Sequence, residues 1–322
     1  MVIVLLALTF YFKTNIIKII AGSIAIISLQ TVLPPKTLKI SVTYCLFSTT
    51  KRFSAQSAVL WAVIDMLLTV DIGNTNITMG IFEGDNLLFT SRLATDRKRT
   101  SDQYSVELLN IFKLHSASCD GFRGAIISSV VPEVTDAVKG AVETVLEVTP
   151  KVLASDIGTG LSIVNNVSGQ LGADLAVVSV AAIDKYPLPC FIIDLGTATK
   201  IILLDENGTF LGCTISAGVG ISLEALAGKT SQLPAVSLKA PASSIGTNTV
   251  DCMKSGTVFG TAAMLDGLTA RMEKDFGKEV RTTVATGGLA REIVKNCTRE
   301  IVYDKDLILD GLKNIYNRQK GQ

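Results

Sequence analysis

Histidine is almost absent from this sequence, which has one His among 322 residues. A metal site built from several histidines, or a catalytic relay that depends on them, is therefore not expected. The cysteines are few and scattered, with no Cys-x-x-Cys pair, at positions 45, 119, 190, 213, 252 and 297. Five of them follow Met66, and an odd number of isolated thiols favours a reducing cytosol over a disulfide framework.

Neither sign of charge is in excess, because the sequence contains 30 Lys and Arg residues and 29 Asp and Glu residues. A net charge of +1 gives no reason to expect a nucleic-acid or acidic-membrane partner. Hydrophobic residues make up 48% and charged residues 18% of the chain, which excludes a disordered protein. The length is sufficient for two ordinary domains with a large core.

Acidic residues are missing altogether from residues 1–64, which contain six basic residues and one of the 26 glycines. Subtracting these six and Asp65 from the totals leaves 24 basic and 28 acidic residues from Met66 onward, a net charge of −4. Two segments of such different composition are not expected to share one core. We therefore treat residues 1–65 as a hydrophobic and basic N-terminal extension.

Three interpretations of this extension remain open: a membrane anchor, a degenerate targeting segment, or upstream sequence read through to an early Met. The apolar run at 19–33 includes four polar residues and falls short of the ~20 apolar residues of a spanning helix. A signal peptide requires a basic segment before its apolar run, and the apolar run at 2–12 has none. We favour the third interpretation, because Met66 directly precedes the first clear strand pattern.

From Met66 the apolar patterns predict two successive units of β-hairpin followed by helix, which indicates an α/β protein with two related halves. Expected strands span 67–73, 77–82, 87–90, 124–131, 190–197, 200–205, 209–213 and 281–285. Expected helices span 101–114, with Ser101 or Asp102 as its cap, 134–146, 221–227, 251–276 and 288–295.

One element occurs twice, as Val70-Asp71-Ile72-Gly73-Asn74-Thr75 and as Ile193-Asp194-Leu195-Gly196-Thr197-Ala198-Thr199. Each copy places an acid at the end of a buried strand, then a Gly and short polar side chains in a tight turn. Gly permits close backbone approach, free N–H groups and hydroxyls bind phosphate oxygens, and the carboxylate faces a cation. One copy would be typical of a plain hairpin turn, but two in the same context favour a phosphate site. Neither is a Walker A or Rossmann loop.

This pair resembles the loops of actin-like, sugar-kinase-type ATPases, and within that superfamily the sequence resembles the type III pantothenate kinases. The resemblance extends from Met66 to about Tyr316 through motifs in a fixed order. Besides the two loops, the motifs are 95–104, Ser128–Pro132, Gly172-Ala173-Asp174, 221–226 with Thr230, Leu233 and Pro234, Asn248-Thr249 with Ser255-Gly256, and 286–290.

The resemblance implies a two-lobed, actin-like (ribonuclease H-like) α/β kinase fold, with lobes at 66–186 and 187–322. It implies that Asp71 holds Mg²⁺, that Asp194 ligates a monovalent cation (K⁺ or NH₄⁺), and that Asp174 is the general base. The residues implied to contact ATP are Asp71, Gly73, Asn74, Thr75, Gly196, Thr197, Ala198, Gly287 and Gly288. Those implied to contact the substrate are Asn165, Gly172, Ala173, Asp174, Leu175 and Thr230.

The sequence departs from the family pattern at four positions. Leu175 stands where the family usually has the Arg that holds the pantothenate carboxylate, and Asn165 stands where it has a Tyr. Ser168 replaces a Pro, and Lys200 replaces an acid. Lys200 has three interpretations: a substitute for the monovalent cation, a phosphate contact, or a solvated strand residue. An acid at a helix start, such as Asp174, is also a candidate N-cap.

The function implied by the resemblance is ATP-dependent phosphorylation of pantothenate to 4'-phosphopantothenate, the first step of coenzyme A biosynthesis, in a cytoplasmic homodimer. Two alternatives remain open. The first is a nucleotide-binding homologue that regulates without phosphorylating pantothenate, and the second is a kinase of another small alcohol, which Leu175 would permit. A nucleic-acid partner is not expected, and a membrane is expected only if residues 1–65 are retained as an anchor.

Overall fold

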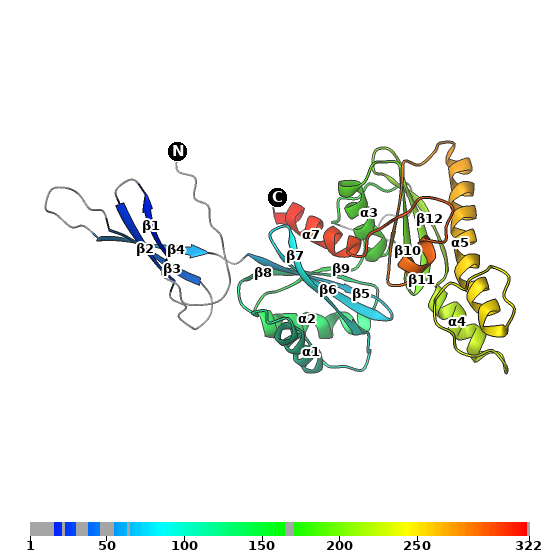
Figure 1. Ribbon diagram of the computed structural model, residues 1–322, viewed down its shortest axis with the longest axis horizontal. Helices are drawn as coiled ribbons and strands as arrows, with labels where there is room; N and C mark the ends of the chain where they lie inside the picture. Colours follow the sequence, from blue (N-terminus) through cyan, green and yellow to red (C-terminus); the bar gives the residue numbers. More distant parts are fainter. Residues whose placement is uncertain are drawn as a thin grey trace. The chain divides into compact units, whose positions relative to one another are not determined.

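The computed structural model describes residues 65–156, 158–164 and 171–319 with their side chains, and the backbone alone of 16–20, 23–29, 38–45, 55–62 and 320. The chain divides into two compact units (Figure 1). One comprises Met1–Asp65 with Ser118–Phe122, and the other Met66–Ala117 with Arg123–Gln322. Across these described ranges, no helix combines the length and the apolar character needed to cross a membrane.

The described strands of the first unit form one antiparallel sheet in which neighbours in the chain are neighbours in space. They are rich in Ile, Val, Leu and Ala, and β-branched residues favour the extended backbone of a strand. The strands are β1 (Ile16–Ile20), β2 (Ser23–Leu29), β3 (Leu38–Cys45) and β4 (Ala55–Ala62). The three interpretations of the extension stay predictions.

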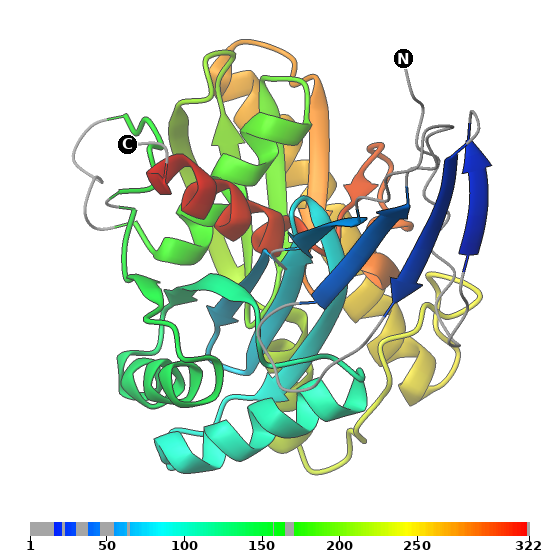
Figure 2. The ribbon, with the colours of Figure 1, turned by 90° about the vertical axis from the view of Figure 1, so that its left-hand side faces the viewer.

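The first lobe of the second unit is a five-stranded sheet in the order β7-β6-β5-β8-β9. Its strands are β5 (Met66–Ile72), β6 (Asn76–Glu83), β7 (Asn86–Ala94), β8 (Phe122–Ser129) and β9 (Lys151–Leu153). The near-continuous apolar run of β5 suits a central strand covered on both faces, and Leu67, Leu68 and Val70 are fully buried. Helices α1 (Ser101–Leu114) and α2 (Pro132–Leu146) lie together along one face (Figure 2).

The second lobe repeats this topology, because its strands take the same relative order, β12-β11-β10-β13-β14. An antiparallel β10–β11–β12 meander is followed by the parallel strands β13 and β14. The strands are β10 (Cys190–Leu195), β11 (Ala198–Leu204), β12 (Phe210–Ala217), β13 (Thr282–Thr286) and β14 (Val302–Tyr303). The predicted duplication of β-hairpin and helix units is therefore confirmed.

Two helices, α3 (Ala173–Lys185) and α7 (Leu307–Lys320), pack against each other and against both sheets. From α3, Ala173 and Val177 join the core of the first lobe, while Leu175 and Val178 join that of the second. Both helices are thus shared by the lobes, although α7 belongs to the end of the chain. The face of each sheet that α3 covers is the face on which the site forms.

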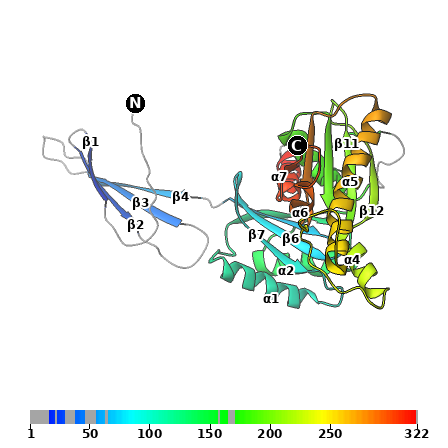
Figure 3. The ribbon, with the colours of Figure 1, turned by 45° about the vertical axis from the view of Figure 1, so that its right-hand side comes forward.

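The opposite face of the second sheet carries α4 (Val219–Gly228), α5 (Thr249–Phe276) and α6 (Ala290–Val294). Figure 3 shows the long α5 on one side of this sheet and α7 on the other. Because side chains alternate along a strand, Ile192 of β10 faces α3, whereas Ile193 faces α5. This alternation assigns every residue of β10 and β11 to one of two environments.

The structure corrects the predicted cap of α1. Thr100, rather than Ser101 or Asp102, is the N-cap, and its hydroxyl accepts a hydrogen bond from the Gln103 N–H while the Gln103 side chain accepts from the Thr100 N–H. The predicted strands and helices occur within a few residues of their expected bounds. The sequence patterns did not indicate β9, β14, α7 or the extent of α3.

Candidate active site

The first Asp-Gly loop, Gly73-Asn74-Thr75, joins β5 to β6, and Thr95, which follows β7, holds its backbone in place. The Gly73 N–H donates to the Asn76 carbonyl at 3.0 Å, which closes the turn. The Thr95 hydroxyl donates to the Gly73 carbonyl at 2.7 Å, and the Thr95 N–H donates to the Thr75 carbonyl at 3.0 Å. With its backbone fixed in this way, the loop leaves the side chains of Asn74 and Thr75 exposed.

The second loop, Gly196-Thr197-Ala198, joins β10 to β11 and meets the first. The hydroxyls of Thr75 and Thr197 lie 2.9 Å apart and form a hydrogen bond between the two lobes. A third loop, which contains Gly287 and Gly288, lies beside them. It follows β13, which ends at Thr286 and pairs with β10. Gly287 there has φ +99°, and a Cβ on it would stand 2.5 Å from the Leu195 carbonyl oxygen. Only glycine fits that position.

Two arginines reach these loops from the first lobe. Arg97 donates to the Asn74 side-chain oxygen at 3.2 Å. Arg92, on the edge strand β7, lies against Gly288 so closely that a Cβ on that glycine would stand 3.1 Å from a guanidinium nitrogen. Exposed glycine-rich backbone, hydroxyls and cationic side chains therefore gather where three loops of two lobes meet, the chemistry that binds phosphate.

Beneath the loops, Lys200 joins two carboxylates from different elements. Its ammonium nitrogen lies 2.5 Å from Asp174 Oδ2, at the start of α3, and 3.0 Å from Asp194 Oδ2, near the end of β10. Asp194 and Lys200 are direct partners in the β10–β11 ladder, so both point to the α3 face. The exposed fraction of each of these three side chains is 20% or less. The interpretation of Lys200 as a solvated strand residue is wrong.

Asp71 adds a third carboxyl to this group. It lies on the same face of β5 as Leu67, which packs with α3 and α7, so it points toward the start of α3. Burial and the charge of Asp174 raise the pKa of Asp71 to about 7, the Asp194 charge adds to the rise, and Ser128 and Lys200 oppose it. Although burial alone would lower it, the pKa of Lys200 is raised by Asp194 and Asp174, so its ammonium stays charged.

Among the residues expected to contact substrate, those of the Gly172-Ala173-Asp174 turn lie at this cluster. Gly172 precedes α3, so Asp174 is not its N-cap but a residue of its first turn. Leu175 departs from expectation, because its side chain is 6% exposed in the core between α3 and the second sheet. Only its N–H reaches the cluster, donating to Asp174 Oδ1 at 2.9 Å. Asn165 lies outside the described residues.

The contacts of Thr230 are made with α4 and not with Asp174. It follows α4, its side chain is exposed, and its hydroxyl donates to the Leu226 carbonyl at 2.8 Å. Because α4 packs with α5, Thr230 belongs to the side of the second sheet opposite to α3. A role for Thr230 in binding substrate stays a prediction.

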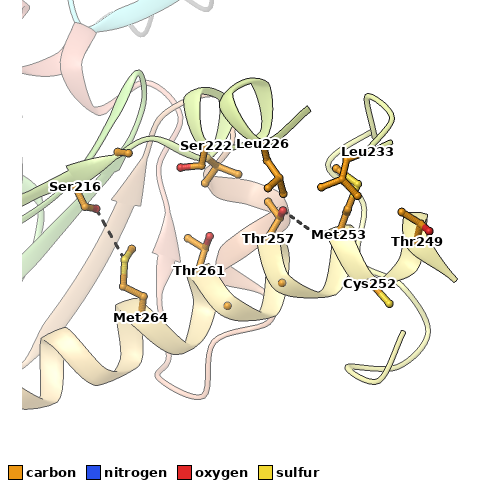
Figure 4. Close-up of a pocket in the computed structure, with 14 residues that line it drawn as sticks. Ser216, Ser222, Leu226, Leu233, Thr249, Cys252, Met253, Thr257, Thr261 and Met264 are labelled. Atoms are coloured by element: carbon orange, nitrogen blue, oxygen red, sulfur yellow. Dashed lines mark hydrogen bonds between the residues drawn. The ribbon is translucent and has the colours of Figure 1, made fainter. Parts of the chain in front are cut away.

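A separate cavity of about 800 Å³, which the sequence did not indicate, lies between β12, α4 and α5 (Figure 4). Small hydroxyls and apolar side chains line it, among them Ser216, Ser222, Thr261 and Met264. Ser216 pairs with Thr199 and so faces α5, whereas Ile215 pairs with Lys200. The cavity and the carboxylate cluster therefore lie on opposite faces of the sheet. The feature of the sequence that could have pointed to such a groove is the pair of glycines at positions 256 and 260, four residues apart on one face of α5.

The repeated topology and the paired Asp-Gly loops define an actin-like, two-lobed fold of the kind found in sugar kinases. Two solved structures share it over most of this chain. A protein described as a Baf family transcriptional activator from Campylobacter jejuni superposes with TM-score 0.50 at 19% identity, covering 79% of this chain and all of the other. A protein described as a 2-dehydro-3-deoxygalactonokinase, from Sinorhizobium meliloti, gives TM-score 0.50 at 13% identity, covering 78% of this chain and 96% of the other.

Sequence comparison identifies the family. The type III pantothenate kinase family model matches residues 67–271. A type III pantothenate kinase of Exiguobacterium sp. is 39% identical over 255 residues, which cover 79% of this chain and all of the relative. The enzyme of the same name from Shouchella clausii is 37% identical over 256 residues, with the same coverage. The chain belongs to the type III pantothenate kinase family.

Proposed function

We propose that this chain transfers the γ-phosphoryl group of ATP to the hydroxyl of pantothenate, giving 4'-phosphopantothenate, the first step of coenzyme A biosynthesis. The observation that carries this proposal is the position of Asp174. Its carboxylate lies at the start of α3, joined through Lys200 to Asp194, which lies two residues before the second loop. A base for the acceptor and the loops for the nucleotide thus stand side by side.

In this proposal the three loops hold the ATP phosphates, with contacts from Gly73, Asn74, Thr75, Gly196, Thr197, Ala198, Gly287 and Gly288. Asp71 holds Mg²⁺, which neutralises phosphate charge when bound. Among the described residues, no group of three Cys, His, Asp or Glu side chains could hold a metal ion. Protein sites bind Mg²⁺ through one or two carboxylates together with substrate phosphates, and Asp71 would supply one such carboxylate.

Asp174 then acts on the acceptor. Its carboxylate accepts the proton of the pantothenate hydroxyl, and the hydroxyl oxygen forms a bond to the γ-phosphorus as the bond from that phosphorus to the β–γ bridging oxygen breaks. ADP leaves, and the proton remains on Asp174 until it passes to solvent. Because phosphoryl transfer depends chiefly on positioning and charge neutralisation, a correctly placed carboxylate is sufficient for this role.

A monovalent cation beside Asp194 does not fit the residues present. The carboxylate already accepts a hydrogen bond from the Lys200 ammonium at 3.0 Å, and a second cation there would be repelled by the first. No step in this proposal therefore involves bound K⁺ or NH₄⁺.

The proposal includes a homodimer in the cytoplasm. Large apolar side chains are exposed along the α4 side of the second lobe, at Ile221, Leu226 and Ile245, between 41% and 78% exposed. Exposed apolar groups of this size are typical of protein interfaces. Light scattering of the purified protein should give twice the mass of the 34.2 kDa chain, and a monomeric mass would contradict the proposal.

One assay of the purified protein tests the activity: release of ADP from Mg·ATP with and without pantothenate. We expect turnover only with pantothenate, and 4'-phosphopantothenate as the product in equal amount. Turnover with another small alcohol in its place would identify a different acceptor. Nucleotide binding without turnover on any alcohol would favour a regulatory homologue.

A further inference from the structure

Lys200 connects three elements that converge on the site. It extends from β11 and donates to Asp174 of α3 and Asp194 of β10, the acceptor side and the nucleotide side of the proposed reaction. Its exposed fraction is 16%, so both ion pairs are largely shielded from water. Ion pairs shielded in this way resist screening by salt, which makes the arrangement a fixed part of the site.

The surroundings of Lys200 explain why a cation is needed there. The carboxyl groups of Asp71, Asp174 and Asp194 lie near the single ammonium of Lys200, so the cluster contains more acidic than basic groups. A nucleotide adds further negative charge at the adjoining loops. Arg97 and Arg92 lie at Asn74 and Gly288, on the loops themselves, and not between the carboxylates. Lys200 places a positive charge within hydrogen-bond distance of both Asp174 and Asp194, and this cation is supplied by the chain itself.

We propose that the Lys200 ammonium is the built-in monovalent cation of this site, so that the protein binds Mg·ATP and transfers phosphate without bound potassium or ammonium. The proposal rests on the proposed function for the transfer step, but nucleotide binding tests it independently of any acceptor. A tethered ammonium loses no translational freedom when it pairs with the carboxylates, whereas a free ion must be recruited from solution. Lys200 acts as a positioning residue, because it holds Asp174 and Asp194 and forms no bond in the reaction.

The test compares the full-length wild type with Lys200→Thr, which removes the ammonium and leaves an oxygen that could join a K⁺ shell. Lys185→Thr is the matched control, because Lys185 also bridges two carboxylates, Asp304 at 2.6 Å and Asp310 at 2.7 Å, away from the loops. Calorimetry measures the affinity for a magnesium complex of a non-hydrolysable ATP analogue. Each measurement is made in choline, potassium and ammonium chloride of equal concentration, and melting temperature is recorded in parallel.

We expect the wild type to have the same nucleotide affinity and melting temperature in all three salts. Lys200→Thr should bind the analogue roughly tenfold or more weakly in choline chloride, since removing one partner of a buried charge pair leaves the other unpaired. Potassium or ammonium should restore most of the loss and raise the melting temperature. Lys185→Thr should be destabilised equally in every salt, because its carboxylates lie outside the site.

A wild type that binds nucleotide only with potassium or ammonium would overturn the proposal, and this result needs no variant. Equal affinity of Lys200→Thr in all salts would overturn it too. If Lys200→Thr does not fold, Lys200→Arg, which keeps the charge, should stay independent of potassium, and dependence there would count against the proposal. A wild type that binds nucleotide without potassium but does not phosphorylate pantothenate would refute the proposed function and leave the role of Lys200 standing.

Discussion

The surroundings of Asp71 oppose the charge of its carboxyl group. Its carboxyl lies near the end of the buried strand β5, close to Asp174 and Asp194, and its pKa is raised to about 7 by burial first and by Asp174 next. An unfolded chain would ionise the same group near its ordinary pKa of 3.8. The folded protein therefore retains a proton that the unfolded chain has already released, and this difference links stability to pH.

The sign of that linkage gives the first prediction. Between about pH 4 and the folded-state pKa, native Asp71 binds more protons than unfolded Asp71, so the free energy of unfolding falls as pH rises through this interval. Asp71→Asn has no proton to lose there. Urea unfolding without Mg²⁺ or nucleotide should show the variant gaining stability relative to the wild type as pH increases to about 8.

Asp136→Asn, at an exposed position of α2, is the control and should keep the wild-type dependence on pH. If Asp71→Asn follows the wild-type curve in parallel, the Asp71 carboxyl is ionised at neutral pH, contrary to this expectation.

Asp174 gives the second prediction. A positioned general base typically contributes ~10²–10⁴-fold, so Asp174→Asn should lower kcat by about that factor. Affinity for Mg·ATP should change little, because the amide retains the shape of the side chain and the loops are untouched. Steady-state kinetics and calorimetry together measure both quantities.

The matched control is Asp184→Asn, because Asp184 lies on the same helix as Asp174. Asp184 bonds with Asn314 and Arg318 at the surface, so its substitution should leave kcat unchanged. A near wild-type kcat for Asp174→Asn would require a different base.

At the scale of elements, α3 decides which residues of one short motif reach the site. Successive residues of a helix point about 100° apart, so adjacent side chains meet different surroundings. Asp174 faces Lys200, while Leu175 packs in the second-lobe core with Ile192 and Ile202. A single helix thus presents a charge at its first turn and contributes apolar residues to both sheets.

This orientation predicts the effect of Leu175→Arg. An arginine there would place a guanidinium among apolar side chains without a matched partner, at a cost of about 3 kcal/mol or more in the free energy of unfolding. Leu175→Met keeps the volume and should cost less than ~1.5 kcal/mol. Chemical denaturation of both variants provides the comparison. Normal stability of the arginine variant together with tighter pantothenate binding would show that side chain 175 faces the acceptor instead.

Local patterns in the sequence predicted the hairpins, the helices flanking them and the two Asp-Gly loops, because alternation and turn residues act over a few positions. They did not predict how Lys200 would be paired, because its bond to Asp174 joins residues 26 positions apart. That contact depends on the β10–β11 register and on the packing of α3. Likewise, the burial of Leu175 follows from the rotation of α3, which the neighbouring Gly-Ala-Asp motif does not reveal.

At the scale of the whole molecule, the lobes are joined by shared helices and by one hydrogen bond between their loops. Helices α3 and α7 contribute to the cores of both sheets, which ties the end of the chain to its first lobe. The Thr75–Thr197 hydrogen bond links the two loops at the proposed phosphate site. All these contacts belong to residues from Met66 onward.

The last prediction concerns residues 1–65. The family model begins at residue 67, and the Exiguobacterium relative is matched over its full length by 79% of this chain. β5, the central strand of the first sheet, starts at Met66, and residues 1–65 group with Ser118–Phe122 in a separate compact unit.

A protein beginning at Met66 should therefore retain the complete kinase fold and the same affinity for Mg·ATP. Its melting temperature should lie within about 3 °C of the full-length value, equivalent to about 1 kcal/mol for a domain of this size. Thermal unfolding of the two proteins side by side makes the measurement, with calorimetric titration of nucleotide to show that the site is intact. A larger fall in melting temperature, or loss of nucleotide binding, would show that residues 1–65 stabilise the kinase fold.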